Sequence, residues 1–212
     1  MSAMVNQLLL EKINKSYGTK SVIQDLNYAF DQGCHVLIGK NGSGKSTLLK
    51  LISGSEKSDS GNITFNGIRL NSDDLTYKSN LGYAPDKLMI YPFLTGEEYL
   101  NFVFLAKKEK NKNQIDDILD GFSVKKYLSY RLEEMSLGNQ KKFILAAAFI
   151  GDPSLLLFDE PTNEIDVAAK AYLVELFNKK IAAEKTIIFS SHDDDFLSKI
   201  HAYKHYANEI FG

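Results

Sequence analysis

The chain has 212 residues, of which 44% are hydrophobic and 25% are charged, as in an ordinary soluble globular protein. Its net charge of −2 at pH 7 excludes a basic nucleic-acid-binding surface at the level of the whole chain. The single cysteine, Cys34, excludes an internal disulfide framework and fits a reduced, cytosolic compartment. No apolar run approaches the ~20 residues needed to cross a bilayer, so a role at a membrane would require a second chain that spans it.

The amino-terminal part is predicted to form strands and turns. Short segments with β-branched and aromatic residues are broken at residues 17–19 and 31–33. A buried-strand pattern then leads into a glycine-rich loop and a helix, which has apolar residues at helical spacing and which Gly54 ends. The predicted strands of this part cover residues 8–13, 21–30, 35–38 and 61–67.

The segment from about residue 91 to 135 has a different pattern and is predicted to be a helical insert. Thr95 and Glu98 form a capping box that starts a helix reaching about Ala106, and a second helix is expected near residues 114–121. After the insert, apolar runs alternate with helices, which predicts a parallel sheet covered on both faces. These later elements are helices at 136–150 and 167–183 and buried strands at 155–158 and 186–189.

The glycine-rich loop matches the spacing of a P-loop. Its glycines let several backbone amides point at one anion, and the helix that follows presents its positive end to the same point. Lys45 would place a charge between the β- and γ-phosphates, the Ser46 hydroxyl would ligate Mg²⁺, and Thr47 would bond a phosphate oxygen. The alternative, a chance match, arises in a chain of this length on the order of one per cent of the time. The predicted nucleotide-binding residues are Gly39, Lys40, Asn41, Gly42, Ser43, Gly44, Lys45, Ser46 and Thr47.

Two acids end the apolar strand predicted at residues 155–158. Asp159, at the carboxyl end of the strand, is placed to hold Mg²⁺ through water, and Glu160 is placed to polarise the water that attacks the γ-phosphate. Two acids after a strand are by themselves weak support for this interpretation, because such a pair also occurs where a helix begins.

The residues that follow resemble a known family, the ABC ATPases, and the resemblance covers nearly the whole chain. Six segments occur in the order that this family has them. Residues 135–140 resemble the signature usually written LSGGQ, 161–166 the D-loop, 190–192 the switch histidine, and 82–86 the Q-loop region. The remaining two are the P-loop and Tyr17, at the position of an aromatic residue that stacks on adenine.

The resemblance implies a fold and a mechanism. The fold is a P-loop NTPase of the α/β class, a single domain over residues 1–212. It has a mainly parallel sheet flanked by helices, an amino-terminal antiparallel β subdomain, and a helical subdomain at about 91–150. Two such domains face each other head to tail, and ATP with Mg²⁺ lies between the P-loop of one and the signature of the other. The implied roles are γ-phosphate sensing by His192, coupling of the two sites by Asp166, and capping by Ser136, Gly138 and Asn139.

The sequence departs from the family pattern at two places. Asp86 stands where the family usually has glutamine; an acid there is still able to bind Mg²⁺ or its water. In the signature, Leu137 replaces the first glycine and Asn139 replaces glutamine, while Ser136 and Gly138 remain. Because Ser136 and Gly138 open the predicted helix, a phosphate contact across the dimer is still expected.

Aromatic residues crowd the region just after Asp86. They are either the packed core of the helical insert or, as the resemblance implies for the transporters of this family, a groove for a short helix of a membrane subunit. The segments at residues 82–86 and 91–95 look most like those of exporter-type ATPases. The favoured function is the ATP-hydrolysing subunit of a membrane transporter, of the exporter type, bound to the cytoplasmic face through a separate permease. A soluble ABC ATPase acting on ribosomes or DNA, and a regulator that hydrolyses ATP poorly, are the alternatives. The residues concerned are Tyr91, Phe93, Tyr99, Leu100, Phe102, Val103, Phe104 and Leu105.

Overall fold

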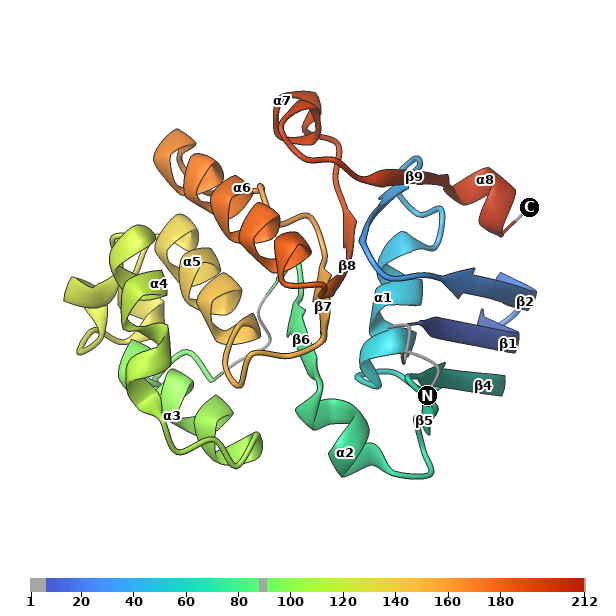
Figure 1. The fold of residues 1–212 in the computed structure, drawn as a ribbon, viewed down its shortest axis with the longest axis horizontal. Helices are drawn as coiled ribbons and strands as arrows, with labels where there is room; N and C mark the ends of the chain where they lie inside the picture. The colour runs from blue at the N-terminus through green and yellow to red at the C-terminus, as the bar shows by residue number, and fades with distance from the viewer. Residues whose placement is uncertain (1–6, 88–90, 212) are drawn as a thin grey trace.

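The protein is described here from a computed structural model, which describes residues 7–87 and 91–211. Two sheets share one body, with an antiparallel sheet at one side, a parallel sheet through the middle, and helices beyond it (Figure 1). The predicted α/β class, with its antiparallel amino-terminal part, is confirmed. In the described part of the chain, no helix has the length and apolar character needed to span a bilayer.

The antiparallel sheet has the strand order β2-β1-β4-β5. Its central strand β1 places Leu8, Leu10 and Ile13 in a core that it shares with the first helix, while intervening side chains face outward. The turn expected at residues 17–19 joins β1 to β2, and both strands extend beyond their predicted ends. The strands are β1 (Leu8–Tyr17), β2 (Lys20–Phe30), β4 (Ser60–Phe65) and β5 (Ile68–Arg69).

The parallel sheet has the strand order β6-β7-β8-β3-β9. Its inner strands β7 and β8 are buried along their whole length, which explains why both are apolar runs rather than alternating patterns. The edge strand β9 was not predicted, because Tyr203 and Lys204 are exposed and its sequence lacks a buried-strand pattern. The strands are β3 (Cys34–Ile38), β6 (Leu81–Ala84), β7 (Leu155–Phe158), β8 (Thr186–Ser190) and β9 (Tyr203–Tyr206).

Helices cover both faces of the parallel sheet, and Figure 1 places α1 on one side and α5 and α6 on the other. The capping box at Thr95 is present, and Ser136 caps α5, one residue before the helix begins. The short α2 was not predicted. The helices are α1 (Lys45–Ser53), α2 (Asp74–Ser79), α3 (Gly96–Ala106), α4 (Asp116–Gly121), α5 (Leu137–Ala148), α6 (Val167–Ala182), α7 (Asp194–Ser198) and α8 (Ala207–Ile210).

Helix α5 joins the helical insert to the parallel sheet. It packs against β6 and β7 on one side and against α3 and α4 on the other. The approach to α3 is close: a β-carbon at Gly96 would lie 2.7 Å from the ring of Phe143. Three short 3-10 helices complete the insert: Lys112–Ile115, Lys125–Tyr127 and Leu132–Glu134. The packing of α5 therefore fixes the position of the signature, which lies at its amino end.

A chain of hydrogen bonds crosses from β2 through β9 to β3. The Tyr28 hydroxyl lies 2.7 Å from Nδ1 of His205, and Nε2 of His205 lies 2.9 Å from Nδ1 of His35. Nε2 of His35 lies 2.8 Å from the carbonyl oxygen of Asp31. Because a carbonyl oxygen only accepts, His35 donates from Nε2, so His205 donates from Nε2 and accepts from Tyr28. Both rings are therefore satisfied in their neutral forms.

We expect the free energy of unfolding to fall as the pH is lowered from about 6.5 to about 4. Burial lowers the pKa of His35, and burial together with the neighbouring His35 lowers the pKa of His205 to about 4. Since the unfolded state binds protons more readily in this window, stability present above the unfolded pKa is lost as the pH falls. His205 alone contributes less than the about 3 kcal/mol of its full shift, because its ring is partly exposed and solvent screens the effect.

Urea unfolding at pH 7 and at pH 4.5 measures this loss. The variant His205→Gln keeps a donor toward His35 but does not titrate, so its stability should fall less over the same range. An equal loss in the variant and in the wild type would contradict the assignment of the effect to this histidine.

Candidate active site

The glycine-rich loop joins the end of β3 to the start of α1. Gly44 precedes the first helical residue with a φ of 101°, a conformation that glycine adopts without strain. Gly39 faces α8, and a β-carbon there would lie 2.6 Å from the β-carbon of Ala207. The loop therefore curls tightly at the amino end of α1, where backbone amides and the helix dipole favour an anion.

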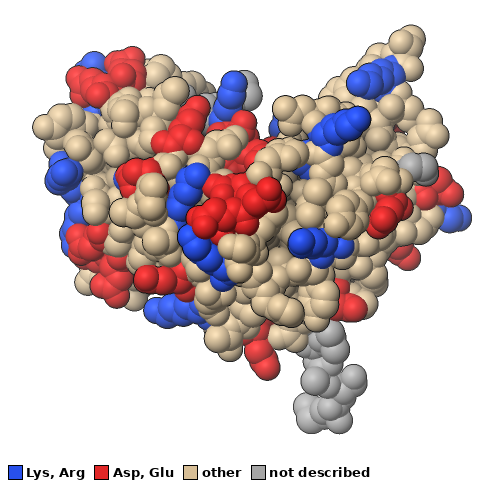
Figure 2. All heavy atoms as spheres, turned by 90° about the horizontal axis from the view of Figure 1, so that it is seen from above, with Lys and Arg blue, Asp and Glu red and all other residues tan. Residues whose placement is uncertain are grey.

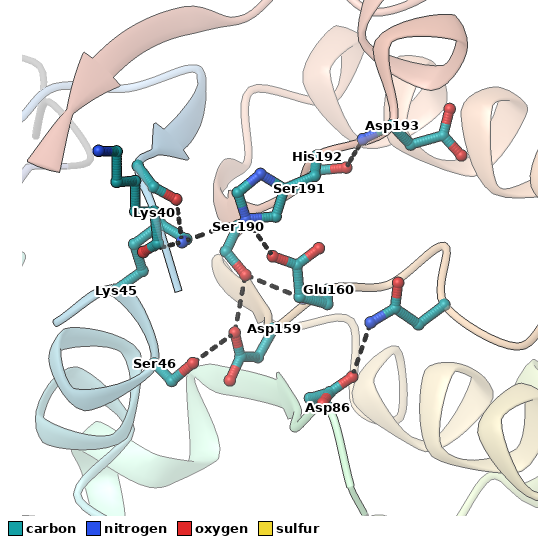
Figure 3. A network of polar contacts seen from close by, with 12 residues as sticks. Lys40, Lys45, Ser46, Asp86, Asp159, Glu160, Ser190, Ser191, His192 and Asp193 are labelled. Atoms are coloured by element: carbon teal, nitrogen blue, oxygen red, sulfur yellow. Dashed lines mark hydrogen bonds and ion pairs between the residues drawn. The ribbon is translucent and has the colours of Figure 1, made fainter. Parts of the chain in front are cut away.

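Lys45 is buried, with 6% of its surface exposed, although it carries a charge. Its ammonium group donates to the carbonyl oxygens of Gly39 and Lys40 and lies 3.4 Å from Nε2 of His192 (Figure 3). The first residue of α1 and the second residue after β8, far apart in sequence, thus meet at one point.

Asp159 lies at the end of β7 with 3% of its surface exposed. The Ser46 hydroxyl donates to Oδ1 of Asp159 at 3.0 Å, and the Ser190 hydroxyl donates to the same oxygen at 2.7 Å. The backbone amide of Glu160 donates to the Ser190 hydroxyl at 2.9 Å. Ser190 therefore links both acids, and the sequence analysis did not assign it a role, although it lies two residues before His192.

Glu160 points toward His192 across the site, with Oε1 lying 3.4 Å from Nε2 of the imidazole (Figure 3). Burial raises the pKa of Glu160, while His192 and Lys45 act in the opposite direction. Its φ of 45° is uncommon for a residue with a side chain, and such strain is typical of functional positions. A half-buried carboxylate with a raised pKa suits a general base.

Lys45, Ser46, Glu160 and His192 line one pocket of about 650 Å³, to which the buried Asp159 is joined through its hydrogen bond with Ser46. Asp86 lies on its wall, where the amide of Asn163 donates to Oδ1 of Asp86 at 3.2 Å. Asn163 was not singled out from the sequence. Gly39 and Lys40, which are also predicted to bind nucleotide, line a second hollow, and their carbonyl oxygens accept from the Lys45 ammonium group of the first pocket. The pocket is lined by Tyr17, Lys20, Val22, Asn41, Gly42, Ser43, Gly44, Lys45, Ser46, Thr47, Asp86, Glu160, Asn163 and His192.

The chain has relatives of known name. A family model described as ABC transporter matches residues 23–163. The linearmycin resistance ATP-binding protein LnrL of Bacillus subtilis (strain 168) is 30% identical over 189 residues, which are 87% of this chain and 61% of that protein. The zinc import ATP-binding protein ZnuC of Buchnera aphidicola is 32% identical, over 92% of this chain and 77% of that protein. The chain belongs to the ABC transporter family.

Solved structures agree with this assignment. The ATP-binding subunit of an ABC transporter superposes with a TM-score of 0.85 at 29% identity, covering 94% of this chain and 85% of that one. A dimeric bacterial ABC transporter cassette, 21% identical, has the same fold with a TM-score of 0.77 and covers 94% of both chains. The resemblance to ABC ATPases is thus confirmed. The chain spans about 60% of the length of the first curated relatives it matches.

In this member of the ABC transporter family, Tyr17 lines the pocket, with 46% of its surface exposed. The Lys15 ammonium lies 5.1 Å from the centre of the ring, a cation–π distance, and is itself held by Glu56 at 3.0 Å. The ring is therefore fixed in place while remaining accessible, as a stacking platform requires.

The signature segment lies at the amino end of α5, and its residues are not among those that line the chain's own pocket. The Ser136 hydroxyl accepts the amide of Asn139 at 3.3 Å. A β-carbon at Gly138 would lie 2.5 Å from the carbonyl oxygen of Glu164, so the D-loop presses against the signature. Leu137, the substituted residue, points outward with 62% of its surface exposed.

Asp166 has two partners within the chain. Its carboxylate caps α6 by accepting the amide of Ala169 at 2.9 Å, and it forms an ion pair with Lys142 of α5. The hydrogen bond from Lys142, followed by that from the amide, lowers the pKa of Asp166. The end of the D-loop is thus tied to the helix that carries the signature.

The site fits a nucleoside triphosphate with Mg²⁺. Among the residues that the structure describes, the buried side-chain oxygens without a partner are Ser43 Oγ and Tyr83 Oη. Ser43 lies in the P-loop, and Tyr83 is close enough to Asp159 for that charge to raise its pKa further after burial. In residues 7–87 and 91–211 no cluster of three His, Cys, Asp or Glu side chains could hold a metal alone. The Ser46 hydroxyl and the Asp159 carboxylate, joined by a hydrogen bond, are oxygen groups of the kind that Mg²⁺ takes from a protein when phosphates and water complete its shell.

Proposed function

We propose that this chain binds and hydrolyses ATP as the nucleotide-binding subunit of an ABC membrane transporter. The observation that carries the proposal is the convergence on one pocket of Lys45 from α1, Glu160 after β7 and His192 after β8, with Asp159 bonded to Ser46 of the same pocket. Release of phosphate from ATP by the purified chain, dependent on Mg²⁺, tests it directly.

The residues have distinct roles in this proposal. The P-loop amides and Lys45 bind the phosphates, while Ser46 and Asp159 would hold Mg²⁺, with Asp86 as a further oxygen ligand or a partner of its water. Mg²⁺ supplies charge neutralisation and alignment of the phosphate oxygens. Glu160 accepts a proton from the attacking water, and His192 holds the Glu160 carboxylate and contacts the γ-phosphate.

A second ATPase domain is part of the proposal. Ser136, Gly138 and Asn139 lie outside the chain's own pocket, at the amino end of a helix of 12 residues. Such a helix end attracts phosphate, so these residues suit the pocket of a partner domain, identical or different. Asp166, between the signature helix and α6, would couple the two sites.

A separate membrane-spanning subunit is the other proposed partner. In the first part of the helical insert, over residues 91–105, four large apolar side chains are exposed by more than half of their surface: Tyr91, Phe93, Phe102 and Leu105. The rings of Tyr91 and Phe93 lie 5.4 Å apart. On the face shown in Figure 2, acidic and basic side chains are interspersed. The exposed apolar side chains favour a contact with another protein. The mixed charges do not favour attraction to nucleic acid.

We expect Phe93→Asp to release the chain from membranes while leaving ATP binding intact. Phe93 is 57% exposed, so the charge would be solvated in the free chain and buried only in the complex. Membrane flotation after co-expression with the permease measures the association. Leu75→Asp is the matched control, because Leu75 on α2 is 72% exposed and lies outside this surface. Unchanged association of Phe93→Asp would count against the surface.

The direction of transport and the location complete the proposal. Among the relatives are proteins named for Nod factor export and for Fe(3+) ion import, so the names support transport in both directions. We propose export, because the segment around Asp86 and residues 91–95 resembles that of exporter-type ATPases. The chain would then work at the cytoplasmic face of the membrane through its permease. Co-purification with the permease in detergent, followed by transport assays in vesicles, tests both points.

A further inference from the structure

Lys141 is a buried lysine that the proposed mechanism does not use. It lies on α5, five residues after the Ser136 cap, and only 2% of its side chain is exposed. A buried ammonium group is unfavourable unless every one of its protons finds an acceptor. The position therefore needs an explanation in the contacts that surround it.

The Lys141 ammonium group donates to three backbone carbonyl oxygens. Those of Pro85 and Asp86 lie at 3.0 Å, and that of Asp159 lies at 3.2 Å. Three acceptors match the three protons of an ammonium group. The Asp86 carboxylate lies 3.7 Å away and supplies the opposite charge.

These contacts connect two loops that carry acids of the active site. Pro85 and Asp86 follow β6, and Asp159 follows β7, with Glu160 as the next residue. Burial lowers the pKa of Lys141, and the charges of Asp86 and Asp159 act against this effect. In this chain the lysine therefore lies beside the acid at position 86, the place where the sequence departs from the family pattern.

We propose that Lys141 is a positioning residue for ATP hydrolysis, which holds the loop after β6 to the end of β7 and so fixes Asp86 relative to Asp159 and Glu160. This inference rests on the proposed function. Without the ammonium group, three carbonyl oxygens lose a donor and the Asp86 carboxylate loses its countercharge. A displacement of Glu160 by about 1 Å is enough to lower the rate of a positioned reaction strongly.

The test compares Lys141→Met and Lys141→Gln with Lys107→Met. Lys107 is a matched control, because it is another largely buried lysine and donates to the carbonyl oxygen of Leu81 at 2.7 Å, at the opposite end of β6. We expect Lys141→Met to lower kcat by about 10- to 100-fold. The affinity for a non-hydrolysable ATP analogue should change by less than about threefold, because the P-loop is untouched. Lys141→Gln, which keeps two N–H donors, should recover part of the rate.

Hydrogen exchange in the free chain gives a second readout, independent of hydrolysis. The backbone amides of Ala84, Asp86, Lys87, Asp159 and Glu160 should exchange faster in Lys141→Met but not in Lys107→Met. A wild-type kcat in Lys141→Met, or equal losses in both methionine variants, would overturn the inference. If the wild-type chain itself hydrolyses no ATP, the proposed function fails instead. The exchange data then decide the inference alone, since unchanged exchange at both segments overturns it.

Discussion

Glu160→Gln is expected to lower the rate of ATP hydrolysis by about 100-fold or more while leaving ATP binding intact. The amide cannot take a proton from water, but it has the shape of the carboxyl group it replaces. Burial already raises the pKa of Glu160, so the site tolerates a neutral group there. The backbone amide of residue 160 keeps its bond to Ser190, so the fold should be unaffected.

Because binding would persist without hydrolysis, Glu160→Gln should also accumulate the ATP-bound dimer. Phosphate release and size-exclusion chromatography with ATP and Mg²⁺ measure the two effects. The added substitution Gly138→Asp should dissociate the dimer, because its side chain would clash with the backbone of the D-loop. Hydrolysis at the wild-type rate would show that Glu160 is not the base.

Lys45→Ala should abolish productive binding of ATP. The Lys45 ammonium group is a charged donor held in the P-loop by the carbonyl oxygens of Gly39 and Lys40. Removal of one donor to a negatively charged transition state typically lowers the catalytic rate by about 100- to 1,000-fold. The stability of the free chain should change little, because two carbonyl oxygens beside an open pocket lose only a bond that water can replace.

Titration with a fluorescent ATP analogue and steady-state hydrolysis measure the effect of Lys45→Ala. Lys50→Ala is the control, because Lys50 is exposed on the same helix, beyond the pocket. Native affinity and native hydrolysis in Lys45→Ala would remove the basis of the proposed function.

The sequence predicted the elements whose pattern is local. The apolar runs at β3, β7 and β8 indicated buried parallel strands, and the Thr95 and Ser136 caps marked the starts of α3 and α5. The edge strand β9 was not predicted, because exposed residues such as Tyr203 interrupt any apolar run there. The helix expected at residues 136–150 ends at Ala148, two residues before the prediction.

The sequence by itself determined the chemical groups of the site, because the P-loop spacing and the paired acids are local patterns that chemistry requires. Only the tertiary structure decided which groups join them. Three contacts join residues that are 18 to 77 positions apart in the sequence. They are the bond of Ser190 to Asp159, that of Asn163 to Asp86, and that of Lys141 to Asp159. Such contacts depend on the order of strands in the parallel sheet, which brings carboxyl ends together. No local pattern along the chain encodes that order.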